Sequence, residues 1–388
     1  MSISPTEFIK VANKTAEHFG FQTVDQLRKA PECRKCEKAM PHTVTGTNKK
    51  QDANHGLLTS AVSTYCEAKL HALERPVLLY SFEQVPRTNE TAVTFHIFNV
   101  ERSIAEAILI HATRALATDL GYKEHTVRIN SLGDSDSLIR YSRELTNFLK
   151  KRLDVMPVDA RELMKEHPVS ALSYLIEQNH ELALRSPNPL EYLSDPSRKH
   201  FREIIEFLDM SETPYEIDPK MMGHQECYSD AIFSLDVNAE EGEESPIVAK
   251  GGRFSEFVYR TTRTRTPAVG AVVILKNSKA PARAPRLKNK NPSVYVVQLG
   301  FGPKIKSLML IDNLRLAGIQ VHHNLASDSL SAQLREAEDR GVKYTLIIGQ
   351  KEFVENTVIF RDMSIRNQEY IDHETLIRRL KKNILANV

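Results

Sequence analysis

A short basic segment divides the chain into two parts of different character. Residues 276–290 read KNSKAPARAPRLKNK, with six basic residues, two prolines and no acid. This composition is typical of an extended linker. At 388 residues the chain is also longer than one ordinary domain. We therefore expect a first unit at residues 1–275, a basic linker at 276–292 and a second domain at 293–388.

Strands and helices alternate in the part of the chain that follows the linker. Apolar runs of strand length alternate with amphipathic stretches closed by Gly318 and Gly341. The expected strands are 294–299, 319–322, 344–348 and 357–361, and the expected helices are 304–317, 329–340 and 373–383. Such alternation is typical of a small α/β domain with a mostly parallel sheet.

The first unit has a different pattern. Two runs rich in Val, Tyr, Phe and Thr, at 77–84 and 91–100, flank a polar tip and predict an antiparallel hairpin. Helices are expected at 4–20, 57–73 and 104–120, and strand-like segments at 126–133, 215–237 and 247–273. Residues 134–213 read as largely helical and are broken by prolines. This pattern predicts an α+β domain with an antiparallel sheet and a helical insertion at 134–213.

The stretch from 250 to 275, KGGRFSEFVYRTTRTRTPAVGAVVIL, contains the strongest local signals in the first unit. The glycines at its start, Gly251 and Gly252, permit a tight backbone or the close approach of a ligand. Arg253 follows them and has a guanidinium suited to a carboxylate or a phosphate. The apolar run from 268 to 275 is compatible with either a buried strand or the start of a buried helix.

Composition excludes several classes of protein. The net charge of +2 is not that of a general polyanion binder, so we expect any nucleic-acid surface to be local and expect no DNA partner. No apolar run is long enough to span a membrane, and the first residues lack the pattern of a secretion signal. Four cysteines are too few for a disulfide framework, which predicts a cytoplasmic protein. Cys33 and Cys36 form a single C-x-x-C, and a loop with two free thiols is favoured over half a zinc site, so no metal is predicted.

Several blocks, in order, resemble histidyl-tRNA synthetase, a class II aminoacyl-tRNA synthetase. The segment FHIFNVE at 95–101 is similar to that family's "FHQFG" strand in the second class II motif. The segment 215–235 aligns without a gap on the histidine-specific segment, and KGGRF with TPAVG is similar to the approach to the third motif. Residues 293–388 resemble the family's anticodon-binding domain. The resemblance implies a class II synthetase-like domain with a helical insertion, followed by an α/β anticodon-binding-like domain.

The same alignment shows where this chain departs from the family. The "VRGLDYY" core, whose arginine stabilises charge as the adenylate forms, reads MGHQECY at 222–228, and Gly223 takes the arginine position. The "FRxE" element reads FEQV at 82–85, and the "RPEGT" element reads LLTSA at 57–61. The third motif normally ends in Gly-Leu-Glu-Arg, but residues 274–277 read ILKN. Losing one such cationic donor typically costs about 2–4 kcal/mol of transition-state stabilisation.

These departures predict a histidyl-tRNA synthetase-like pseudoenzyme that lacks efficient amino-acid activation. Arg87 and Arg253 are the only candidate catalytic residues, and ATP and Mg²⁺ are expected as cofactors only if the protein is active. The candidate residues of the altered pocket are Tyr228, Glu226, Gly251, Gly252 and Gly270.

The resemblance also implies binding partners. We expect contact with tRNA or a tRNA-like RNA, a role in translation and a homodimer, because class II synthetases of this type are usually dimers. A basic surface would contact RNA phosphates. Its candidate residues are Lys279, Arg283, Arg286, Lys288 and Lys290 in the linker, with Arg315 and Arg335 in the second domain.

Two other functions remain open at this point. An active, divergent histidine–tRNA ligase would need Arg87 and Arg253 to replace the missing arginines. A regulatory subunit of a histidine-biosynthesis enzyme is the other alternative, although such regulators as a rule lack the anticodon-binding domain that this chain resembles.

Overall fold

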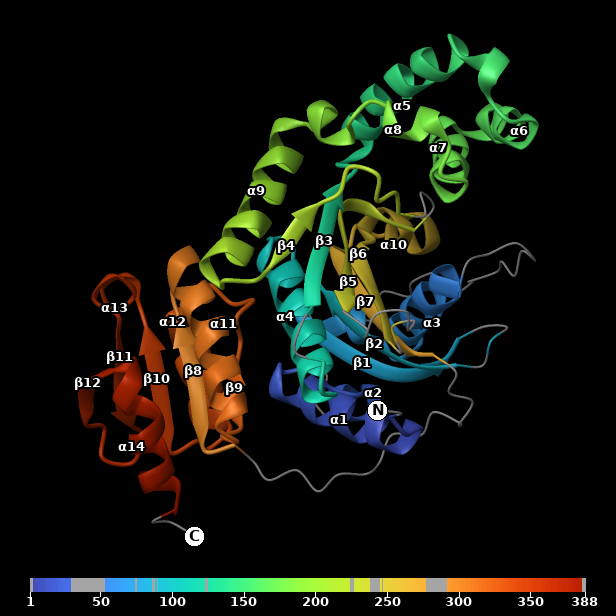
Figure 1. The fold of residues 1–388 in the computed structure, drawn as a ribbon. Helices are drawn as coiled ribbons and strands as arrows, with labels where there is room; N and C mark the ends of the chain where they lie inside the picture. Colours follow the sequence, from blue (N-terminus) through green and yellow to red (C-terminus); the bar gives the residue numbers. More distant parts are fainter. Residues whose placement is uncertain are drawn as a thin grey trace.

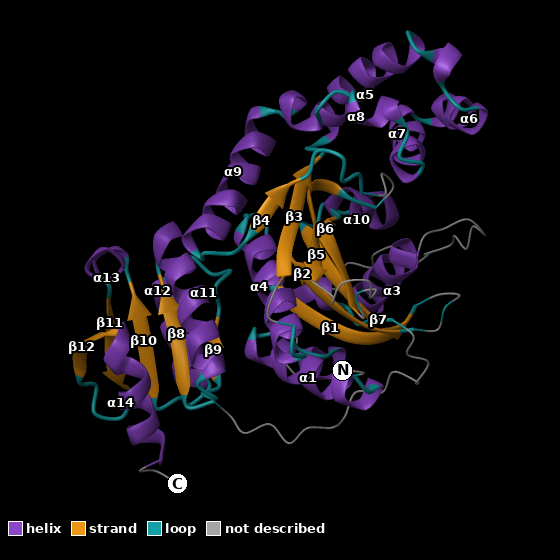
Figure 2. Ribbon diagram, viewed as in Figure 1, coloured by secondary structure: helices purple, strands orange, loops and turns teal. Residues whose placement is uncertain are grey.

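The computed structural model of the chain describes residues 3–28, 53–73, 75–85, 88, 90–122, 125–223, 227–237, 245, 247–276 and 292–385. Within these residues the strands form two sheets, one of seven strands and one of five (Figure 1). Helices lie on both faces of the larger sheet and extend beyond one end of it (Figure 2). The two sheets lie on either side of the basic linker in the sequence.

The larger sheet has the strand order β1-β2-β7-β6-β5-β3-β4, and only the β3–β4 pairing is parallel. Its strands are β1 Val77–Gln84, β2 Thr91–Phe98, β3 His125–Ser131, β4 Tyr215–Ile217, β5 Ser229–Val237, β6 Ile247–Arg253 and β7 Ala268–Leu275. Side chains alternate between the two faces of each strand. On β5, Phe233 and Leu235 join the main hydrophobic core, whereas Ser234 and Asp236 face a pocket on the other side.

Different helices cover the two faces of this sheet (Figure 1). The core face packs against α1 Pro5–His18, α4 Ile104–Asp119 and α9 Asp195–Met210. The other face carries α3 Ala53–Glu67 and α10 Ser255–Thr262, which share a second hydrophobic cluster. Two short helices, α2 Val24–Arg28 and η1 Leu70–Leu73, complete this unit. Thirteen of the sixteen residues of α4 are buried, so this helix is the centre of the core.

The segment between β3 and β4 is helical and has a hydrophobic core of its own. Its elements are α5 Ser135–Lys150, η2 Leu153–Val155, α6 Val158–Glu166, α7 Pro168–Glu177, α8 Glu181–Leu184, η3 Pro189–Tyr192 and α9. Asp134 caps α5, since its side chain accepts a hydrogen bond from the Ser137 N–H at 2.9 Å. Gly133 precedes it with φ of 71°, and an added Cβ there would lie 2.4 Å from Ser137.

The smaller sheet has the order β12-β11-β10-β8-β9. Its elements are β8 Val294–Gln298, α11 Phe301–Leu316, β9 Val321–His323, α12 Leu330–Asp339, β10 Tyr344–Ile348, α13 Gln350–Glu355, β11 Thr357–Asp362, β12 Gln368–Asp372 and α14 His373–Leu385. The pairings of β8 with β9 and β10 are parallel, and those of β11 with β10 and β12 are antiparallel. The sheet is therefore evenly mixed.

Direct contacts join the C-terminal domain to the first unit. On α4, Asp119 accepts hydrogen bonds from the Arg315 guanidinium on α11 and from the Thr15 hydroxyl on α1, the latter at 3.0 Å. Next to them, His18 Nε2 lies 2.8 Å from the Ile311 carbonyl oxygen. One hydrophobic cluster contains buried residues of both sheets and extends through this contact. The two domains therefore share a core.

The α+β fold class expected from the sequence is confirmed, but several details of the secondary structure were wrong. The segment expected to be strand between 247 and 273 contains the helix α10, and the elements α13 and β12 were not predicted. The smaller sheet was expected to be mostly parallel, but only half of its pairings are. Residues 255–262, SEFVYRTT, are rich in aromatic and β-branched side chains, which favour strands locally. Tertiary packing of Phe257 and Val258 outweighs that preference.

We predict that Asp119→Ala weakens the contact between the two domains. The change leaves the buried Arg315 guanidinium without one of its two carboxylates and removes the acceptor for Thr15. We expect a loss of about 1–3 kcal/mol in stability, measured by urea unfolding, together with faster proteolysis between the domains. The exposed Asp339→Ala is the matched control. Equal unfolding curves and equal proteolysis for both variants would contradict the prediction.

Candidate functional site

A pocket of about 810 Å³ lies on the face of the seven-stranded sheet opposite α4. Strands β3, β5 and β6 form its floor, the segment that follows β4 forms one wall, and α7 of the insertion forms another. Its described lining includes Arg128, Asp218, Lys220, Met222, Gly223, Tyr228, Ser234, Asp236, Lys250, Glu177 and Ile176. A space of this size is typical of a ligand site.

Charges of opposite sign balance in this pocket. The described lining has three basic residues, Arg128, Lys220 and Lys250, and three acidic ones, Glu177, Asp218 and Asp236. The charge of Arg128 is already balanced, because its guanidinium forms an ion pair with Asp218 and lies 3.7 Å from Asp236. The described lining therefore offers no excess of positive charge to a polyanionic ligand.

The structure brings together some of the predicted pocket residues. Tyr228 and Gly251 both line the pocket. Gly252 is covered by the Tyr228 ring, because an added Cβ at Gly252 would lie 2.9 Å from that ring. Gly270 is covered in the same way by His96, at 2.5 Å. These two glycines thus admit aromatic side chains against the sheet, and Glu226 lies outside the described residues.

Gly223 stands at the edge of the pocket. An added Cβ there would lie 3.2 Å from both Ile232 and Tyr228, which is closer than ordinary van der Waals contact. A larger side chain at this position would have to displace its neighbours. The position that resembles the family's arginine therefore presents no cation and little room for one.

The first hairpin places a carboxylate on the same face of the sheet. Glu83, near the end of β1, accepts hydrogen bonds at Oε1 from Ser81 at 3.0 Å and from Ser60 at 3.2 Å. Ser60 belongs to α3, and its neighbours Leu58 and Ala61 are buried. Residues 57–61 therefore form part of a packed helix rather than a loop open to a ligand.

Arg253 lies on the opposite face of the sheet from the pocket. Its Nε and Nη2 donate to the two carboxylate oxygens of Glu106 on α4 at 2.8 and 2.9 Å, and Nη1 donates to the Val100 carbonyl. The side chain is 6% exposed. This geometry argues against Arg253 as a clamp for ATP. The other candidate, Arg87, lies outside the described residues.

The cluster around Glu106 is a buried ion-pair network that sequence reasoning missed. His200 on α9 also contacts Glu106, with Nε2 2.9 Å from Oε1. Burial alone would raise the pKa of Glu106, but the charges of Arg253 and His200 and their hydrogen bonds outweigh it and lower the pKa to about 2. The sequence did contain a sign of this network, namely a single glutamate in the largely apolar helix IAEAILIHATRALATD, since a buried carboxylate requires a partner.

A serine–aspartate network at the base of the insertion continues from this cluster. Burial raises the pKa of the Asp230 carboxyl, and Asp230 accepts a hydrogen bond from Ser197 on α9 at 2.8 Å. Ser197 in turn accepts a hydrogen bond from the Asp134 N–H at 3.0 Å. The network therefore connects β5 to both ends of the helical insertion.

The predicted RNA-binding residues fall into three groups. Arg315 is buried in the contact between the domains and is unavailable to RNA. Arg335 is exposed on α12. The five linker residues from Lys279 to Lys290 lie outside the described residues. Sequence reasoning did not single out the exposed cations of α14, Arg378, Arg379, Lys381 and Lys382, although the run RRLKK was visible.

The described residues contain neither a candidate metal site nor a candidate membrane-spanning helix. Among the described residues, no group of three or more His, Cys, Asp or Glu side chains is arranged to hold a metal ion. Cys33 and Cys36 lie outside the described residues. No described helix is long and apolar enough to cross a membrane.

Comparisons with known proteins agree with this architecture. A family model described as "Anticodon binding domain" matches residues 293–383. A histidine–tRNA ligase from Geobacillus sp. (strain WCH70) is 26% identical over 282 residues, which are 72% of this chain and 67% of the relative. Another from Bacillus licheniformis is 25% identical over 338 residues, 84% of this chain and 80% of the relative. This chain is therefore similar to histidine–tRNA ligases along most of its length.

The fold comparison extends over the whole chain. The crystal structure of apo S. aureus histidyl-tRNA synthetase aligns with a TM-score of 0.51 and 17% identity, covering 98% of this chain and 97% of that one. These likenesses in sequence and fold confirm the resemblance to histidyl-tRNA synthetase seen in the sequence. Within this histidyl-tRNA synthetase fold, Glu83 and Gly223 stand at positions where the sequence comparison expected arginines.

We predict that Glu106→Gln makes stability less dependent on pH in acid. A folded-state pKa near 2 against 4.5 for a free glutamate means that ionised Glu106 stabilises the fold above pH 4.5. That contribution, roughly 3 kcal/mol, is lost as the pH falls from 4.5 toward 2. Urea unfolding from pH 7 to pH 2.5 should therefore show a smaller fall for the variant than for the wild type.

The same variant should be less stable than the wild type at pH 7, by about 3–5 kcal/mol, because Arg253 remains buried without a counter-charge. The exposed Glu338→Gln serves as the control and should unfold like the wild type at every pH. Parallel pH profiles for the Glu106 variant and the wild type would show that this carboxylate does not titrate as the geometry implies.

Proposed function

We propose that this protein binds tRNA or a tRNA-like RNA and does not activate an amino acid. The observation that carries the proposal is the balanced charge of the pocket on the synthetase-like sheet. Adenylate formation depends on positioned cations that stabilise the phosphate oxygens. Arg128, the one arginine in the described lining, is held by Asp218 and Asp236.

The neighbouring positions support the loss of catalysis. Glu83 brings a negative charge to the β1 end of the same face, where it would repel a nucleotide phosphate. Gly223 has no side chain that could contact a phosphate, and Tyr228 and Ile232 limit the space there. Arg253, which an active enzyme would need as a replacement, is held by Glu106 on the opposite face.

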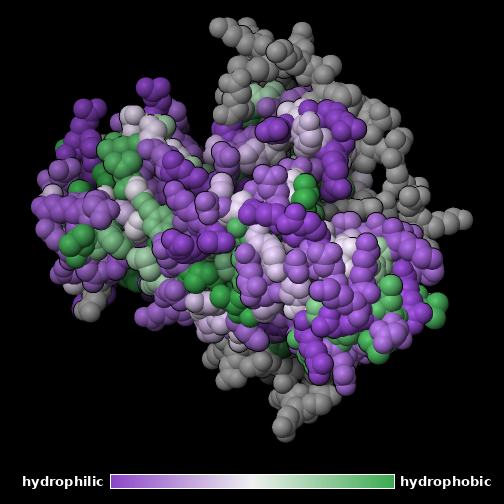
Figure 3. All heavy atoms as spheres, turned by 90° about the horizontal axis from the view of Figure 1, so that it is seen from above, coloured by the Kyte–Doolittle hydropathy of each residue, from purple (hydrophilic) through white to green (hydrophobic). Residues whose placement is uncertain are grey.

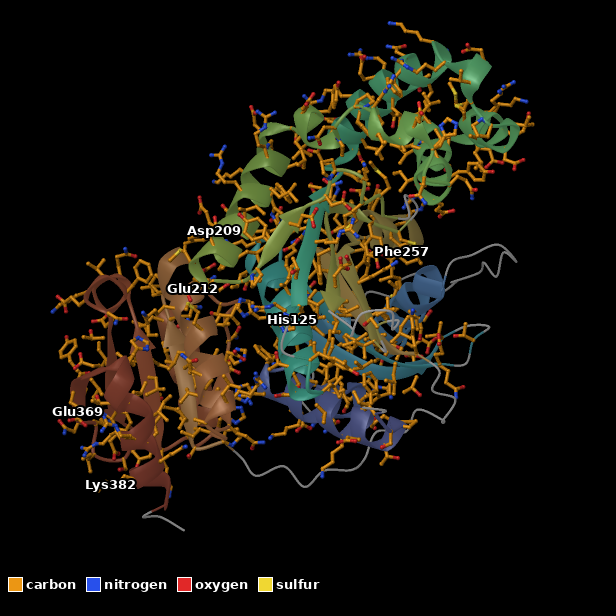
Figure 4. The ribbon with its side chains drawn as sticks, in the orientation of Figure 1. His125, Asp209, Glu212, Phe257, Glu369 and Lys382 are labelled. Carbon is orange, nitrogen blue, oxygen red and sulfur yellow. The ribbon has the colours of Figure 1, made fainter. Side chains whose placement is uncertain are left out.

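The C-terminal domain supports the binding of RNA. The curated relatives are histidine–tRNA ligases, and the anticodon-binding model covers nearly the whole of this domain. Exposed Arg378, Lys381 and Lys382 lie along α14, next to β12. Figure 4 shows Lys382 on the side of this domain that is remote from the seven-stranded sheet. Cations of this kind contact the phosphate backbone.

An aromatic side chain adjoins these cations. Tyr370 on β12 is 57% exposed, and the Lys351 ammonium lies 5.2 Å from its ring centroid. Exposed aromatic rings beside basic residues are typical of surfaces on which unpaired bases stack. We propose that α14 and β12 form the RNA-contacting side of the domain. The expected homodimer, the role in translation and the regulatory alternative stay predictions.

We predict that the purified protein does not catalyse ATP–pyrophosphate exchange with histidine. The exchange rate should equal the background measured without protein, because the described pocket residues include no arginine that is free to stabilise the α-phosphate. A histidine–tRNA ligase relative, assayed in parallel with ATP and Mg²⁺, is the positive control. Exchange at a rate comparable to that relative would restore the view of this protein as an active ligase.

We predict that the double variant Lys381→Ala/Lys382→Ala binds tRNA more weakly than the wild type. Each lost phosphate contact should reduce the slope of log K against log salt by about 0.9. Filter binding or fluorescence anisotropy at several salt concentrations measures both the affinity and the slope.

The matched control removes two exposed lysines from α1, Lys10→Ala/Lys14→Ala. It changes the net charge by the same amount on a helix remote from α14 (Figure 1). If the two double variants lose the same affinity, the contribution is general and α14 is not the contact surface.

A further inference from the structure

A second cavity lies between the two domains. It shares no lining residue with the pocket on the seven-stranded sheet. Its volume is about 240 Å³. One wall comes from the end of α1, from α2 and from the segment that leads into β1. The other wall comes from β9 and α12 of the C-terminal domain. Each domain thus supplies half of the cavity.

The walls combine apolar residues with seven amide or imidazole side chains, out of 21 lining residues. His18, Gln22 and Gln26 line the first wall, and Gln320, His322 and Asn324 line the second. Amides and imidazoles both donate and accept hydrogen bonds. They can therefore match a neutral ligand whose edge alternates donors and acceptors.

The hydrogen bonds of two histidines indicate which ring nitrogens remain available. His18 Nε2 lies 2.8 Å from the Ile311 carbonyl and donates to it, so Nδ1 of the neutral ring is an acceptor. Nδ1 of His322 lies 3.3 Å from a guanidinium nitrogen of Arg340 and accepts from it, so its Nε2 carries the proton. One wall thus offers an acceptor nitrogen and the other offers a donor.

The environment of His323 also bears on the cavity. Both of its ring nitrogens are buried, and neither forms a hydrogen bond of normal geometry with a described residue, although the ring interacts with the backbone of His18. Its ring lies against Gly20, where an added Cβ would be 3.3 Å away. A buried imidazole that is only partly satisfied costs free energy. A ligand or water in the adjoining cavity would relieve that cost.

Charge and size restrict the ligand further. The charged lining residues Glu17, Arg75, Glu336 and Arg340 sum to zero, and Arg340 donates to Glu336 at 2.8 Å. A volume of 240 Å³ equals about eight waters and is below the usual range for drug-sized ligands. The cavity therefore suits a small, neutral and planar ligand better than a phosphate or an amino acid.

We infer that this interdomain cavity receives an unpaired nucleobase of the bound RNA. Nucleobases are neutral rings with alternating donors and acceptors, and proteins read their edges with amide side chains and stack them on aromatic rings and guanidinium planes. The inference rests on the proposed RNA-binding function. It adds a base-reading site that both domains form together, separate from the phosphate contacts on α14.

The experiment measures nucleoside binding without RNA. The full-length protein is titrated with adenosine, guanosine, cytidine and uridine in turn, and binding is followed by saturation-transfer NMR. At least one nucleoside should bind, with others weaker. The double variant Gln22→Ala/Gln320→Ala should weaken that binding about tenfold, because it removes two amides. The exposed Gln350→Ala on α13 is the matched control.

RNA binding is then measured with the same variants. A loss of affinity for tRNA in the double variant, with an unchanged salt slope, would support base recognition rather than phosphate contact. If the wild type binds RNA but neither it nor any variant binds a nucleoside, the inference is overturned and the proposed function stands. A third outcome is that the wild type binds a nucleoside, the double variant loses that binding, and the wild type binds no RNA. This result would support the cavity as a base site and refute the proposed RNA function.

Discussion

The ion pair between Arg253 and Glu106 holds the first unit together at its centre. It joins β6 to α4 across the buried face of the sheet, and His200 extends it to α9 at the base of the insertion. Three segments far apart in the sequence thus meet at one carboxylate. A buried charge of this kind requires its partners, since either charge alone would be strongly destabilising. The fold therefore uses for structure the arginine that the sequence first presents as a catalytic candidate.

The opposite face of the same sheet shows that a synthetase-like fold can be kept while the charges of its pocket change. The fold is similar to that of apo S. aureus histidyl-tRNA synthetase. Seen from above, the described surface of the molecule is mostly hydrophilic (Figure 3). The floor of the pocket nevertheless carries Asp236 beside Arg128, and Glu83 stands further along the sheet. Charged residues are accommodated at these positions because their side chains do not belong to the main core. Packing constrains the whole of the core face, whereas the other face is packed where α3 and α10 cover it and is open at the pocket.

Much of the fold could be predicted from local patterns. The bounds of β1 were predicted to the residue, and those of α4 to within one residue, because both segments are rich in apolar residues and end at clear local signals. The helix α10 was missed because its aromatic and β-branched residues favour a strand, and the tertiary contacts of Phe257 are invisible in the sequence. At the site, Tyr228 and Gly251 were correctly predicted to line the pocket. The ion pairs of Arg253 with Glu106 and of Arg315 with Asp119 were missed, because the partners are more than a hundred positions apart in the sequence. Periodicity carries no information about such long-range pairing.

The shared core between the domains has a consequence for how this protein would discriminate among RNAs. Because Asp119, Arg315 and the apolar residues around them fix the orientation of the C-terminal domain, α14 and the interdomain cavity keep a constant separation. A scaffold that is rigid before binding loses little conformational entropy when it binds. It can also engage both surfaces only with an RNA whose contact points have the matching spacing. The distance between two distant parts of the RNA, and not its sequence alone, would then decide which molecule is bound.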